Sequence, residues 1–82
     1  MPLIQLSSNP KLSVGVKQTT KVLSEGRALR VYIARDAEQH VVRQILKLAE
    51  EHSVEVEYVD LMKELGKACG IDVGAATAVI EK

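Results

Sequence analysis

The stretch that decides the fold is Leu65-Gly66-Lys67-Ala68-Cys69-Gly70-Ile71-Asp72-Val73-Gly74-Ala75-Ala76. Its three glycines stand four residues apart, between a helical pattern and an apolar, strand-like pattern. Because glycine lets the backbone turn sharply and lets another backbone or a ligand approach closely, we expect regular structure to break here. Two apolar residues, Ile71 and Val73, would form the tips of a loop held between glycines. Such a loop is typical of a binding element.

Outside this stretch, strand-like and helix-like patterns alternate along the chain. Alternating apolar residues predict strands over residues 11–14, 29–34 and 54–58. Residues 75–80 fit a buried central strand or a last turn of helix, and their Thr, Val and Ile favour the strand. Helical spacing predicts helices over residues 16–25 and around the apolar residues of 41–49 and 61–68. Residues 1–10 would carry at most a short helix before a break.

This order of elements predicts one domain over residues 1–82, with helices on both faces of a small sheet. The expected fold is α/β, a three-layer α/β/α sandwich with a four-stranded mixed sheet. By the rules for such sheets, ligands gather at the end where helices begin and loops converge. The two loops best placed for this are residues 15–21 and 66–73.

Acidic residues give more local signals. Asp36, with Gln39 three residues later, forms a capping-box pattern before the second helix, and Asp60 is placed to cap the third. Glu55 and Glu57 alternate with apolar residues, which predicts a half-exposed strand at an edge of the sheet. We interpret these two glutamates as solvated charges rather than as an acid/base pair.

The amino-acid composition limits which kinds of partner the protein can bind. The chain has two tyrosines and no Phe or Trp, which excludes a large aromatic platform for stacking bases. Formal net charge is +0, but residues 1–24 hold three lysines and no acid (+3), while residues 25–82 hold eight bases and eleven acids (−3). This asymmetry predicts a basic end and an acidic flank. One cysteine, with no leader or long apolar run, predicts a cytoplasmic protein without a membrane segment.

Signals for catalysis or metal binding are absent from the sequence. Cys69 has no neighbouring His or second Cys, so we expect a small buried apolar residue rather than a nucleophile or metal ligand. His40 and His52 stand twelve positions apart and are expected to be exposed. The glycine spacing also lacks the Gly-Lys-Ser/Thr of a phosphate loop. We therefore expect no catalytic residue, no metal, no cofactor and no small-molecule substrate.

A glycine turn leads into the first helix at Gly15. The helix start, with Lys17, Gln18 and Lys21, combines free backbone N–H groups, the positive end of the helix dipole and side-chain donors. That combination suits an anion. On the pattern alone, a plain capped surface helix is an equal interpretation.

Two segments about fifty residues apart resemble a known pair of RNA-binding signatures. Gly15-Val16-Lys17-Gln18-Thr19-Thr20-Lys21 and Leu65-Gly66-Lys67-Ala68-Cys69-Gly70-Ile71-Asp72-Val73 are similar to those of the kink-turn-binding ribosomal-protein superfamily (large-subunit protein seven-Ae and thirty-e type). The short chain looks like the compact bacterial branch. The resemblance implies an α/β/α sandwich without catalysis that binds RNA as a monomer. It implies an RNA site of Gly15, Lys17, Gln18, Lys21, Gly66, Lys67, Gly70, Ile71, Asp72 and Val73.

The resemblance also implies roles for these residues. Lys17 and Gln18 would approach the guanine edges of sheared G·A pairs, and Lys21 would meet the adjacent backbone. Ile71 and Val73 would cover a nucleotide expelled from the stack, with glycine backbones making room. Archaeal and eukaryotic members have Asn-Glu where this chain has Lys17-Gln18. This difference predicts more salt-sensitive binding.

Two other classes of function stay open on the sequence. One is a protein-interaction domain of the same fold that uses the apolar loop tips and binds no RNA. The other is a small hydrolase, which would need a polar cleft that the sequence does not indicate.

Overall fold

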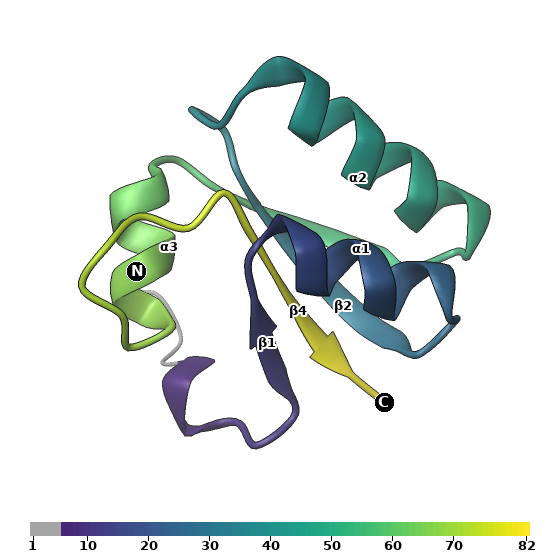
Figure 1. Cartoon of the computed structure of the whole chain (residues 1–82), viewed down its shortest axis with the longest axis horizontal. Helices are drawn as coiled ribbons and strands as arrows, with labels where there is room; N and C mark the ends of the chain where they lie inside the picture. Colours follow the sequence, from purple (N-terminus) through teal and green to yellow (C-terminus); the bar gives the residue numbers. More distant parts are fainter. Residues whose placement is uncertain (1–5) are drawn as a thin grey trace.

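Four strands form one mixed sheet in the computed structural model, which describes residues 6–82. The expectation for residues 1–5 lies outside this range. The elements, shown in Figure 1, are a 3-10 helix η1 (Leu6–Ser8), β1 (Leu12–Val14), α1 (Val16–Ser24), β2 (Ala28–Ala34), α2 (Gln39–Glu51), β3 (Glu55–Val59), α3 (Met62–Ala68) and β4 (Thr77–Glu81). Strand order is β1-β4-β2-β3, with β4 antiparallel to both neighbours and β3 parallel to β2. Strand β4 therefore lies inside the sheet. This confirms the prediction of a buried central strand over residues 75–80, which rested on their Thr, Val and Ile.

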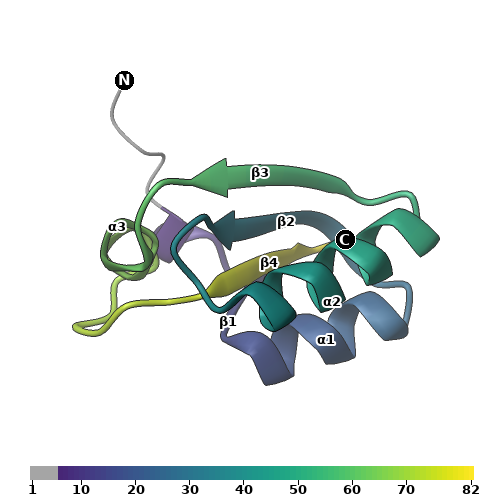
Figure 2. The same ribbon diagram turned by 90° about the horizontal axis from the view of Figure 1, so that it is seen from above.

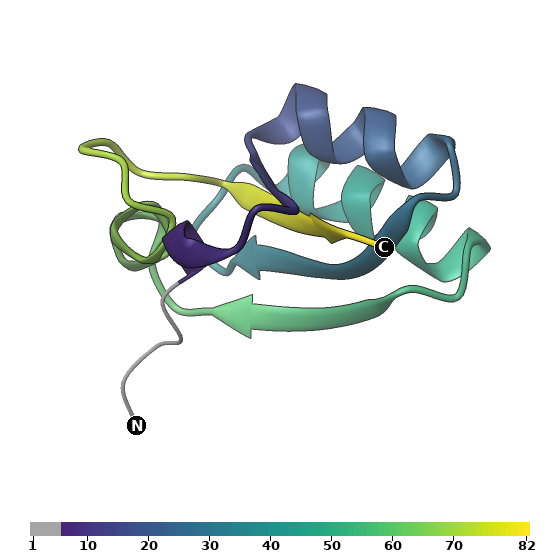
Figure 3. The ribbon, with the colours of Figure 1, turned by 90° about the horizontal axis from the view of Figure 1, so that it is seen from below.

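Helices cover both faces of the sheet, which confirms the predicted α/β/α sandwich. On one face, Leu23 of α1 and Ile45 of α2 pack in one buried cluster with Val31 and Val79 of the central strands. On the other face, α3 and η1 share a second cluster with side chains of β2 and β4. Figures 2 and 3 show α1 and α2 side by side, while α3 lies at the end of the sheet where β2 and β3 finish. Within residues 6–82 no helix is long and apolar enough to cross a membrane.

The edge strand β3 carries its charges on the surface. Glu55 and Glu57 are exposed, and both face Arg30 of β2, at 3.4 Å and 3.9 Å between guanidinium nitrogen and carboxylate oxygen. Exposed ion pairs of this kind contribute about 0–1 kcal/mol each. The prediction of a half-exposed edge strand with solvated glutamates is confirmed.

Both predicted helix caps are wrong. Helix α2 begins only at Gln39, after an N-cap Glu38 that makes no side-chain hydrogen bond, so Asp36 stands too early in the chain to cap it. The Asp60 carboxylate faces Arg35, with 3.4 Å between Oδ1 and Nε. Asp36 instead accepts a hydrogen bond from the first backbone N–H of α3, because the loop after β2 passes beside the start of that helix.

Candidate nucleic-acid interface

The start of α1 is exposed to solvent, and its backbone N–H groups are free to donate hydrogen bonds to a ligand. Gly15, with φ +104°, is the N-cap residue, and no side chain of the described residues caps this end. The first helical hydrogen bond runs from Thr19 N–H to Gly15 C=O at 3.0 Å, which leaves the earlier N–H groups of the first turn without helical partners. Lys17 and Lys21, one turn apart and on the same face, are exposed, as is Gln18. This helix start therefore presents donors and positive charge together.

The loop from α3 to β4, residues 69–76, begins with a helix-ending motif. Gly70, with φ +79°, donates its N–H to the Lys67 C=O at 3.0 Å, and the next residue, Ile71, donates to the Gly66 C=O at 3.0 Å. This is the Schellman pattern, which needs a left-handed residue at the Gly70 position. Because the break comes here, Gly66 lies inside α3 and the loop starts after Ala68.

The second half of this α3–β4 loop, residues 73–75, also packs against helix α3. A Cβ built on Gly66 would lie 2.0 Å from the Val73 carbonyl oxygen, so only glycine allows the loop to pack against the helix here. At the other end of α3, the Met62 C=O accepts the Ala75 N–H at 3.0 Å. The loop is thus fastened at both ends of one short helix. Its tip stays on the surface, where Ile71 is 37% and Val73 70% exposed.

The α1 start and the α3–β4 loop meet at one end of the sheet. The Gly15 N–H donates to the C=O of Thr77, the first residue of β4, at 2.9 Å. Thr77 is itself buried and donates its Oγ1–H to the Tyr32 C=O of β2 at 2.7 Å. Figures 1 to 3 agree that α1 begins, and the loop projects, at this same end of the sheet. Two segments far apart in sequence are therefore joined through a rigid central strand.

All ten predicted site residues lie on α1 and its N-cap, in the second half of α3 or in the α3–β4 loop. Eight have exposed positions that a ligand can reach: Lys17, Gln18, Lys21, Lys67, Gly70, Ile71, Asp72 and Val73. Gly15 is half-buried under its bond to β4, and Gly66 is buried against the loop. Sequence reasoning did not connect Asp36 with this region. Its carboxylate matched a local capping pattern for α2, but in the structure it contacts the start of α3.

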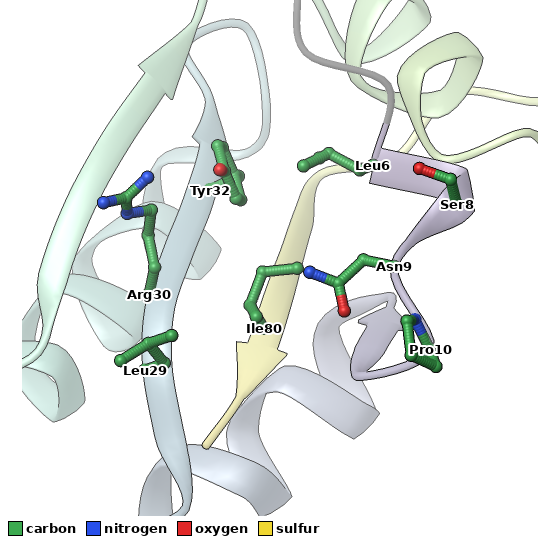
Figure 4. A pocket seen from close by; sticks show the side chains of 8 residues that line it. All are labelled: Leu6, Ser8, Asn9, Pro10, Leu29, Arg30, Tyr32 and Ile80. Atoms are coloured by element: carbon green, nitrogen blue, oxygen red, sulfur yellow. The ribbon is translucent and has the colours of Figure 1, made fainter.

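A groove of about 540 Å³ lies elsewhere, between the segment of residues 6–10 and side chains of β2 and β4. Figure 4 shows Leu6 and Pro10 on one wall and Leu29, Tyr32 and Ile80 on the other. None of the residues that line this groove is an acid, a histidine or a cysteine, so it offers no acid/base pair for hydrolysis. It also includes no predicted RNA-binding residue.

Cys69 is a free thiol, 7% exposed, in the α3 core, as expected for a small buried apolar residue. Burial raises the pKa of this thiol above its usual value, so less thiolate is present at any given pH. We expect iodoacetamide at pH 8 to alkylate the folded protein at least about tenfold more slowly than the chain unfolded in urea. Equal rates in the two states, measured by mass spectrometry, would show that the thiol is accessible.

Comparison with known proteins shows the family of this chain. The chain matches the model of the "Ribosomal protein L7Ae/L30e/S12e/Gadd45 family" over residues 3–82. It is 55% identical over 69 residues to "RNA-binding protein TTE2299" of Caldanaerobacter subterraneus subsp. tengcongensis, covering 84% of each chain. It is 47% identical over 78 residues to "RNA-binding protein BH0128" of Halalkalibacterium halodurans, covering 95% of each. Among solved structures, the "Giardia lamblia 15.5kD RNA binding protein" matches with a TM-score of 0.81 at 27% identity, over 88% of this chain and 61% of that one.

The fold and the candidate interface define a small α/β/α domain whose exposed helix start and glycine-bordered loop lie at one end of a mixed sheet. The chain belongs to the ribosomal protein L7Ae/L30e/S12e/Gadd45 family. The resemblance read from the two sequence signatures is thereby confirmed at the level of the family.

Proposed function

We propose that the chain binds kink-turn RNA, an internal loop with tandem sheared G·A pairs and a sharp bend, and stabilises the bent form. RNA binding without catalysis is supported by membership of the family and by relatives that are named RNA-binding proteins. The observation that carries the finer proposal is the bond between Gly15 N–H and Thr77 C=O, because it ties the start of α1 to β4, the strand that follows the α3–β4 loop, at the end of the sheet where that loop lies. On this proposal the protein is ribosomal or ribosome-associated and acts as a monomer in the cytoplasm.

The α1 start would read the base pairs. The deep groove of a regular RNA helix is too narrow for side chains, but sheared pairs and a sharp bend open it. Lys17 and Gln18 would then reach guanine edges, with Gln18 accepting through its amide oxygen. Lys21, one turn along the same helix face, would neutralise a phosphate of the adjacent backbone. The uncapped N–H groups of the first turn favour the same negative ligand.

The α3–β4 loop would shelter the nucleotide that the bend expels from the stack. Ile71 and Val73 already lie on the surface, so the loop need not rearrange to reach a base. Covering the base would remove the apolar area of both side chains from water, which favours binding. Asp72, which stands between them in the chain, and Lys67 of α3 are also exposed, and both would border the covered base. An apolar surface of this kind needs no aromatic ring, which reconciles the proposal with the chain's lack of Phe and Trp.

A binding titration tests the proposal. We compare a kink-turn RNA with the same RNA whose G·A pairs are replaced by Watson–Crick pairs, at several salt concentrations. Because each mismatched pair in a recognised site typically costs about 1–3 kcal/mol, we expect the duplex to bind at least about tenfold more weakly. If each of the three lysines of the site, Lys17, Lys21 and Lys67, displaces one counterion from the RNA, the logarithm of the association constant should fall with the logarithm of the salt concentration at a slope of about −2 to −3. Equal affinity for the plain duplex would contradict kink-turn recognition.

A further inference from the structure

We infer that Asp36 is a positioning residue for the RNA-binding loop, because its carboxylate caps α3 from a separate segment and so sets the place of the helix that holds the loop. The inference rests on the proposed function, since it concerns the α3–β4 loop as an RNA contact. Asp36 itself lies in the connection between β2 and α2 and is not one of the residues that we propose to touch RNA.

The hydrogen bond that carries this inference runs from Met62 N–H to Asp36 Oδ1 at 2.8 Å, between residues 26 positions apart. Helix α3 has seven residues, and its own N-cap, Leu61, provides no side-chain acceptor. A helix this short is marginal alone, so its terminal partners matter more than in a long helix. A negative carboxylate at the N-terminus of a helix also interacts favourably with the positive end of the helix dipole. Asp36 therefore supplies the cap that the local sequence of α3 lacks.

Met62 links this cap to the loop through the two polar groups of its backbone. Its N–H donates to Asp36, and its C=O accepts the Ala75 N–H, which closes the loop before β4. At the other end of α3, the Gly66 C=O accepts the Ile71 N–H, and the Gly66 α-carbon packs against the Val73 carbonyl. A shift or fraying of the first turn of α3 would therefore move the loop tip.

The sheet gives Asp36 a fixed starting point. The two preceding residues are bonded on opposite sides: Ala34 N–H donates to Ala76 C=O at 2.9 Å, and Arg35 N–H donates to Val59 C=O at 2.7 Å. Asp36 thus leaves β2 at a place held by both β3 and the end of the α3–β4 loop. The loop is held directly through Ala76 and indirectly through Asp36 and α3. Removing the Asp36 carboxylate would break the second of these connections and leave the first.

Three variants distinguish the positioning role of Asp36 from an effect of its negative charge and from a general loss of stability. Asp36→Ala removes the acceptor, Asp36→Asn keeps an amide oxygen that caps about as well, and Asp60→Ala removes an equal charge from the residue before the N-cap of α3. We expect Asp36→Ala to bind kink-turn RNA about tenfold more weakly. Asp36→Asn and Asp60→Ala should stay within about twofold of the wild type. The salt slope should not change, because no lysine is altered.

A double-mutant cycle tests whether Asp36 acts through the loop. Val73→Ala removes an apolar tip, so its cost in affinity should be smaller in the Asp36→Ala background than in the wild type. Additive losses would contradict coupling. Equal losses for Asp36→Ala and Asp60→Ala, or for Asp36→Ala and Asp36→Asn, would reduce the effect to charge and overturn the inference. So would wild-type affinity in Asp36→Ala.

Hydrogen exchange of the free proteins tests the positioning without RNA. In Asp36→Ala the amides of Ile71 and Ala75 should exchange faster than in Asp60→Ala, while that of Val79 in the central strand is unchanged. Uniformly faster exchange, Val79 included, would mean general destabilisation and would overturn the inference. If the wild type binds kink-turn and duplex alike while the exchange result holds, the proposed function fails and the positioning of the loop stands.

Discussion

Lys21→Glu should lower the affinity for kink-turn RNA by about a hundredfold, which corresponds to about 2.7 kcal/mol. The change removes a cation that we propose to meet a phosphate and places a like charge beside the RNA backbone, a juxtaposition that costs several kcal/mol. Lys21 is exposed and takes part in α1 only through its backbone, so the fold should survive. A glutamate in the last turn of α1 would cost about 0.3–1 kcal/mol through the helix dipole.

Lys82→Glu is the charge-matched control. Lys82 follows β4, whose five residues separate it by about 16 Å from the end of the sheet where the loop lies. That distance is about twice the screening length at physiological salt, so this variant should bind like the wild type. An equal loss in both variants would indicate general charge repulsion instead of a local contact. Unchanged RNA binding in Lys21→Glu would contradict the phosphate contact proposed for Lys21. If the wild type bound no RNA and a protein contact through Ile71 and Val73 survived Lys21→Glu, the alternative of a protein-interaction domain would be favoured.

Gly66→Ala should destabilise the fold, although alanine is the better helix former by about 1 kcal/mol. The added Cβ would lie 2.0 Å from the Val73 carbonyl oxygen, and a backbone atom cannot move away as a flexible side chain can. Overpacking of this kind costs about 1–3 kcal/mol, which outweighs the gain in propensity. We expect a lower free energy of unfolding in urea. RNA affinity should fall about tenfold or more, because the loop must leave α3.

Gly74→Ala is the graded control for this prediction. Its Cβ would meet the Met62 Cβ at 3.1 Å, a contact that a shift of a few tenths of an ångström relieves. The loss of stability should therefore be clearly smaller than for Gly66→Ala. If Gly66→Ala were instead more stable than the wild type by about 1 kcal/mol, helix propensity would dominate and the close contact with Val73 would not exist in solution.

Most of the secondary structure of this chain was predictable because most elements carry their own periodicity. Alternating apolar residues marked β3 and an apolar stripe marked α2, since both patterns express which side of an element faces a core. Strand β2 was marked by the alternation of Leu29, Val31 and Ile33, although both of its faces are buried. The last strand was harder, because both of its faces are buried and alternation is lost. Its β-branched residues still favoured the correct choice.

The predictions that failed depend on contacts between distant segments. Asp36 and Asp60 both match local capping patterns, yet the Asp36 carboxylate meets a helix 26 positions away and Asp60 faces Arg35. The helix predicted around residues 61–68 is confirmed, so Gly66 lies inside it and not in the predicted loop 66–73. The glycine spacing could not reveal that Gly66 makes room for the Val73 carbonyl. The two halves of the candidate site are predictions from sequence signatures. Their junction through Gly15 and Thr77 required the fold.

The most direct test of the central claim is a titration of kink-turn RNA with fluorophores at its two ends, in low magnesium, with energy transfer as the readout. Without protein the RNA should stay extended, because few ions offset its crowded phosphates. A protein that binds the bent form better must shift the population toward it. We predict that energy transfer rises to a plateau with added wild-type protein, and that Lys21→Glu needs about a hundredfold more protein. No rise in transfer at protein concentrations that saturate binding would contradict the claim that this chain stabilises kink-turns.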